Sequence, residues 1–269
     1  MIPNHPLRRL AASKLFLLGC IIISIGVFAS AASAFAIARP ELDQMLTEMM
    51  NEASARSPET FEQMQLLYPY LSAITLASGI IFSLVLSSVP AVAAWLIYGT
   101  ARSSRASMRI LGFTIFRIYL LFSLWIMVFS LVASLLESIG SDSFYSITST
   151  LLEGLMNVAM LIAARKLLFA SIEVIKTGKT NVPITNQCPI LILINLFVAI
   201  GSLALQLYAN IYPNPVGQMD AYLFADKLSL ISGLAASVVG IAEYAVFYRL
   251  SRKGIEALTA DNLPEESAI

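Results

Sequence analysis

Charged and reactive side chains are scarce in this sequence, and their scarcity excludes most kinds of catalytic and metal site. Only 13% of the 269 residues are charged, whereas 58% are hydrophobic. The single histidine, His5, excludes zinc sites built on paired histidines and Ser–His catalytic pairs. Cys20 and Cys188 have no paired spacing and are interpreted as buried structural thiols. We therefore expect no metal site, no cofactor and no enzymatic activity.

The chain also has no excess of charge of either sign. Its 17 basic residues balance its 17 acidic residues. Proteins that bind nucleic acid present a basic surface to the phosphate backbone. The balance therefore argues against a nucleic-acid partner.

Long apolar runs are what the sequence does contain, and there are six of them. Each is longer than the roughly 20 residues that a helix needs to cross the hydrocarbon core of a bilayer. They predict an all-α polytopic membrane protein, a bundle of six transmembrane helices embedded in the lipid bilayer. The runs are Lys14–Ala38, Tyr68–Tyr98, Arg109–Leu136, Phe144–Phe169, Cys188–Tyr212 and Lys227–Tyr248.

The basic residues are sorted to one side of these runs. If every run crosses once, 13 lysines and arginines fall on the side of the termini. Only Arg39, Arg56 and Lys227 fall on the other side, and Arg117 lies inside the third run. The positive-inside rule then places both termini in the cytoplasm, and we expect the protein in the cell membrane. A competing interpretation is that Ala29–Ala34 ends a cleaved signal peptide, which would leave five spans.

The runs divide the chain into a cytoplasmic lead (1–13), a transmembrane domain (14–255) and a short acidic cytoplasmic tail (256–269). The only sizeable segment outside the membrane is 39–66, an external amphipathic helical segment between the first two runs. Its apolar residues recur at helical spacing, and Ser57-Pro58-Glu59 is typical of the start of a second helix. It is interpreted as an interfacial helix pair, a docking surface for a partner, or a methionine site for a soft metal.

Polar residues inside the runs are the candidate functional residues, because ionisable groups in a membrane are costly and usually face a bundle interior. Thr150, Glu153 and Asn157 share one face of the fourth run. Asn195 and Gln206 lie in a similar stripe on the fifth run. These five residues are predicted either to line a path for a substrate or ion, with Glu153 facing a cavity, or to be helix-packing seams.

A possible ion pair inside the membrane joins the third and sixth runs. Arg117 and Glu243 lie at similar depths, roughly 12 and 9 Å from the cytoplasmic side at 1.5 Å per residue. The alternative is that Arg117 extends alone to the interface.

These observations lead to two hypotheses about function. The first is a small permease, or the membrane subunit of a transporter, for a small solute or ion. In it Glu153 is the coupling carboxylate, and a cytoplasmic ATPase is one conceivable partner. The alternative is a non-catalytic accessory membrane protein that binds a partner protein through its acidic external segment.

Overall fold

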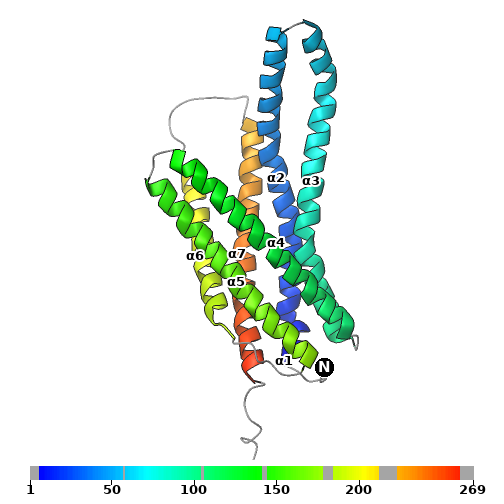
Figure 1. The fold of residues 1–269 in the computed structure, drawn as a ribbon, viewed down its shortest axis with the longest axis vertical. Coiled ribbons are helices and arrows are strands. Elements are labelled where there is room, and N and C mark those ends of the chain that lie inside the picture. The colour runs from blue at the N-terminus through cyan, green and yellow to red at the C-terminus, as the bar shows by residue number, and fades with distance from the viewer. Residues whose placement is uncertain are drawn as a thin grey trace, which may run out of the picture. The chain divides into compact units, whose positions relative to one another are not determined.

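The computed structural model describes residues 6–56, 58–103, 106–140, 144–177, 184–211 and 223–260. Seven helices account for nearly all of them, and no strand occurs in these ranges (Figure 1). The predicted all-α class is therefore confirmed. The helices are α1 (Pro6–Ala11), α2 (Lys14–Arg56), α3 (Pro58–Arg102), α4 (Ala106–Gly140), α5 (Phe144–Thr177), α6 (Gln187–Ile211) and α7 (Leu223–Ala260).

Five segments of the described helices are long and apolar enough to cross a membrane, so the chain is a multi-pass helical membrane protein. The fourth predicted run, Phe144–Phe169, occupies most of α5, and its crossing stays a prediction. The five segments are Lys14–Ala36, Phe61–Arg102, Ile110–Leu136, Gln187–Tyr208 and Lys227–Ala260.

The helix boundaries refine the predicted segments. α2 continues without interruption from the first span to Arg56, so the first half of the external segment is an extension of that helix. α3 begins at Pro58, as the sequence indicates. α7 continues to Ala260, past the predicted boundary at 255, because Ala257 and Leu258 are buried. The rest of the tail, 261–269, lies outside the described residues.

The chain forms two compact units. One contains Met1–Ile23, Val89–Ile200 and Ile241–Ile269, and the other contains Ser24–Ser88 and Gly201–Gly240. In the first unit, α4 packs along α5 (Figure 1). The second contains the adjoining parts of α2 and α3, which follow one another along the chain (Figure 1).

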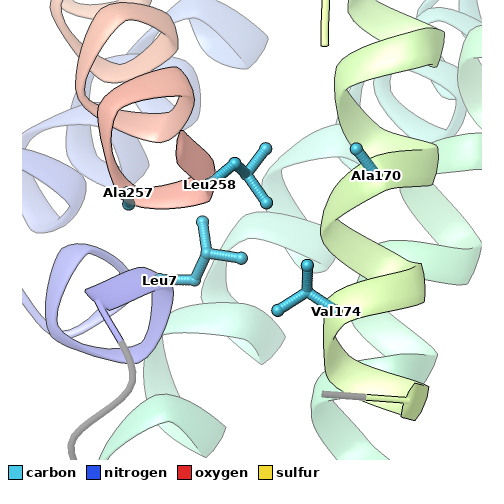
Figure 2. Close-up of a cluster of buried hydrophobic side chains, with 5 residues drawn as sticks. All are labelled: Leu7, Ala170, Val174, Ala257 and Leu258. Atoms are coloured by element: carbon cyan, nitrogen blue, oxygen red, sulfur yellow. The ribbon is translucent and has the colours of Figure 1, made fainter. Parts of the chain in front are cut away.

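The first unit is built around the short N-terminal helix. Leu7 of α1 is buried against α5 and α7 (Figure 2). The Arg8 side chain donates hydrogen bonds to the carbonyl oxygens of Ala101 (2.9 Å) and Ser103 (3.2 Å), at the end of α3. Because the last carbonyls of a helix have no partner within the helix, Arg8 acts as a cap. The cluster in Figure 2 consists of Leu7, Ala170, Val174, Ala257 and Leu258.

Glycine sets the distance between α3 and α4. A Cβ atom on Gly112 would lie 2.8 Å from Ile97 Cγ1 and 3.0 Å from the Ala93 carbonyl oxygen. Backbone cannot shift as readily as a side-chain end, so the two helices approach this closely only with glycine at this position. At Gly99, by contrast, a Cβ would lie within 4 Å of no side chain and no other helix among the described residues.

We expect Gly112→Ala to destabilise the protein by about 1 to 3 kcal/mol, because the added methyl group overpacks the helix contact. The matched control is Gly99→Ala, which adds the same methyl group in open space. It should be neutral or stabilising by up to about 1 kcal/mol, since alanine favours helix. Thermal unfolding of both purified variants in detergent measures the difference. Equal melting temperatures would contradict the close contact.

Candidate functional site

Three ionisable side chains of α5 and α7 form the candidate site, which we call the acid–tyrosine cluster: Glu153, Glu243 and Tyr244. The carboxylates of Glu153 and Glu243 are both close enough to Tyr244 to interact with it electrostatically. All three residues belong to the first compact unit.

The packing between α5, α6 and α7 holds Tyr244 in place. Tyr244 packs with Met160 against a buried cluster of Ala163, Cys188 and Ile192. These residues come from two helices, α5 and α6, which position the phenol ring by van der Waals contact. The tyrosine is therefore packed against the core of the first unit.

Asn195 extends the polar character of this region onto α6. Its side chain is buried, and its Nδ2 donates a hydrogen bond to the Leu191 carbonyl oxygen at 2.9 Å. The same nitrogen lies 3.5 Å from Met160 Sδ, on α5. A buried amide needs such partners, because an unsatisfied polar group in an apolar environment costs free energy. The predicted site residue Asn195 thus lies at the α5–α6 contact.

Glu153 has a different position from the one expected. Its side chain is exposed on the surface of the single chain, whereas Asn157 and Thr150 are half-buried. Leu152 and Leu155 beside it are also exposed, at 72% and 57%. On the opposite side, a Cβ on Gly154 would collide with the side chain of Leu131 on α4. Because Gly154 faces α4, Glu153 is turned away from that contact and faces outward.

The remaining residue of the predicted path, Gln206, belongs to the second unit. Its Oε1 accepts a hydrogen bond from Ser237 Oγ at 3.4 Å, which joins α6 to α7 within that unit. Gly233 and Gly240 lie on the same helix as Ser237. No atom of the described residues would approach within 4 Å of a Cβ at either glycine.

Arg117 contacts an aromatic ring. Its guanidinium carbon Cζ lies 4.1 Å from the centroid of Phe169 on α5. Such a cation–π contact is favourable, most strongly where water is excluded. The predicted ion pair with Glu243 stays a prediction, since the contact of Arg117 in this structure is with the ring.

Sequence reasoning missed two participants of these sites. Tyr244 follows Glu243 directly in the sequence, but it was not among the predicted site residues. Phe169 comes four residues after Arg165, a spacing that places both on one helix face. That spacing is a usable signal for the contact within α5. The approach of Arg117 from α4 has no signal in the sequence.

Comparison with known proteins identifies no relative: no family model, no curated protein and no solved structure matches this chain.

Proposed function

We propose that the chain is the membrane subunit of a transport assembly that moves a small solute or ion. The observation that carries this proposal is the outward-facing Glu153. A carboxylate against lipid tails is costly, and intramembrane acids usually mark ion or substrate paths. A second chain packed on this face of α5 would cover Glu153 and form a path between chains. Glu243 and Tyr244 would then lie behind it.

In this proposal the protein has six spans, with α5 as the fourth, and both termini are in the cytoplasm of a cell. The distribution of basic residues supports this orientation. A cytoplasmic ATPase is one conceivable partner. The α3–α4 and α5–α6 connections would then be its docking sites, and parts of both lie outside the described residues.

Cysteine labelling in sealed cells tests the six spans. We expect a cysteine at Ser54 or Thr148 to react with an impermeant maleimide from outside, and one at Lys176 to react only after the cells are opened. All three side chains are exposed. Background should be low, because the native Cys20 and Cys188 are only 1% and 2% exposed. Labelling of positions 148 and 176 from the same side would contradict a crossing by α5.

Cross-linking tests the covered face. A photoreactive phenylalanine analogue at Leu152 should capture a protein in native membranes, whether a second copy or a different chain. Ile231, which is 63% exposed in the second unit, is the control position. The purified assembly in proteoliposomes should move protons or cations above the rate of protein-free vesicles. Capture of lipid alone at position 152, with no flux, would contradict the proposal.

A second candidate function, an accessory protein with an external docking surface, is favoured by the α2–α3 hairpin of the second unit. α2 continues for 20 residues beyond its span at Ala36, or roughly 30 Å at 1.5 Å per residue.

The surface of this extension of α2 is partly apolar. Leu42 and Leu46 are buried, whereas Met45 and Met49 are 50% and 42% exposed. The surface also carries the exposed acids Glu48, Glu52 and Glu62. Exposed apolar side chains beside acids are typical of a binding surface. The test is to delete the end of α2 and the start of α3. If this removes a bound partner but leaves flux unchanged, the accessory function is better supported than the transport function.

A further inference from the structure

Two arginines of the first unit contact a single phenylalanine ring. Arg117 Cζ on α4 lies 4.1 Å from the centroid of Phe169, and Arg165 Cζ on α5 lies 5.7 Å from the same centroid. α4 packs along α5 (Figure 1), and both positive charges lie close to this one ring. Like charges repel more strongly in a medium of low dielectric constant than in water. One ring face offsets only part of this repulsion.

Within the described residues, the two guanidinium groups have N–H donors without acceptors. In the part of the chain that the structure describes, neither group donates a hydrogen bond or forms an ion pair, and the buried Nε of Arg165 has no acceptor. The next acid on α5, Glu173, lies one turn beyond Phe169 and forms no ion pair with either arginine in the same ranges. Lys166, which is exposed, adds a further positive charge. An arginine carries five donors, so an anion with several acceptor oxygens can accept hydrogen bonds from both groups at once.

The depth of the pair matches a lipid headgroup. The span in α4 begins at Ile110, so the Arg117 backbone lies seven residues, or roughly 10 Å, inside it. A long arginine side chain can reach from this depth to the interface. Next to the pair, Leu121 and Ile162 are 37% and 42% exposed, one turn deeper on α4 and α5. These two residues provide an apolar surface for an acyl chain.

We propose that Arg117 and Arg165 bind the phosphate of an anionic phospholipid beside Phe169, with the acyl chain against Leu121 and Ile162. Arginine forms paired hydrogen bonds with phosphate oxygens, which suits this group better than a point charge. Free inorganic phosphate shares the same chemistry. The apolar surface beside the pair favours the lipid, and basic sites between transmembrane helices are known to bind lipid headgroups.

Native mass spectrometry of the delipidated full chain in nonionic detergent tests this site, with dioleoyl phosphatidylglycerol as the probe. We expect one retained lipid in the wild type and at least a tenfold loss of its affinity in Arg117→Gln and in Arg165→Gln. Arg102→Gln is the matched control, because Arg102 alone contacts the ring of Tyr98 at 4.8 Å. This variant should retain the lipid. Bound lipid is counted on the folded chain, so a loss of stability does not imitate the result.

Three comparisons test whether the site recognises the negative charge, whether its ligand is a lipid or free phosphate, and whether it needs arginine. Dioleoyl phosphatidylcholine, which has no net charge, should bind at least tenfold more weakly than phosphatidylglycerol. Inorganic phosphate at millimolar concentration should not compete with phosphatidylglycerol, and full competition would overturn the lipid assignment. Arg117→Lys should bind less well than the wild type but better than Arg117→Gln. Equal lipid binding by wild type, Arg117→Gln and Arg165→Gln would overturn the site.

Discussion

Leu258→Ala is expected to lower the free energy of unfolding by about 3 kcal/mol, within the range of 2 to 5 found for buried leucines. Leu258 is 0% exposed and lies where α1, α5 and α7 meet (Figure 2). Truncation removes its contacts with Leu7 and Val174 and leaves a cavity in this cluster. The helices on either side are fixed by other contacts, including the Arg8 cap, so the cavity cannot close fully.

Leu205→Ala is the control for this prediction. Leu205 is 70% exposed, so its truncation leaves no cavity in the chain. In detergent, the melting temperature of Leu258→Ala should fall by about 5 to 10 °C, and that of Leu205→Ala by much less. A double mutant with Leu7→Ala should be less destabilised than the sum of the two single variants, because both residues belong to one cluster. Additive losses would contradict a direct contact between α1 and α7.

Much of the fold follows from the sequence because bilayer thickness imposes a length on each apolar run. Pro58 likewise indicates the start of α3, since proline suits the first turn of a helix. The N-terminal lead shows the limit of this reasoning. Residues 6–11 are too few to show a helical period, so the burial of Leu7 and the capping bonds of Arg8 appear only in three dimensions.

The candidate site was less predictable than the fold. Costly polar residues are visible in any apolar run, and Glu153, Asn195 and Glu243 stand out for this reason. Whether each of these side chains faces the protein or the surroundings depends on which face of its helix contacts a neighbouring helix. That contact depends on individual side chains. At α5 the deciding residue is Gly154, whose lack of a side chain admits Leu131 of α4 and turns Glu153 outward. Sequence periodicity carries no information about which neighbour a face meets.

Either lipid or a second chain covers Glu153 in the membrane. Substitution of Glu153 distinguishes the two, because its expected effects on stability are opposite. If a second chain covers it, Glu153→Leu leaves a polar partner unsatisfied, which costs about 1 to 3 kcal/mol. The assembly should then dissociate roughly tenfold or more readily. If lipid covers it, leucine removes a costly carboxylate, and the variant should be more stable than the wild type.

We expect the first result. Glu153→Gln should keep the assembly, because the amide retains the shape and hydrogen-bonding capacity of the acid, and should lose proton or cation flux, because the amide cannot ionise. Glu256→Gln is the matched control: Glu256 is exposed on α7, and this variant should keep both assembly and flux. Native mass spectrometry of mild detergent extracts measures assembly, and a pH-sensitive dye in proteoliposomes measures proton flux. A higher melting temperature of Glu153→Leu with unchanged subunit composition would place this carboxylate against lipid and remove the basis for a path between chains.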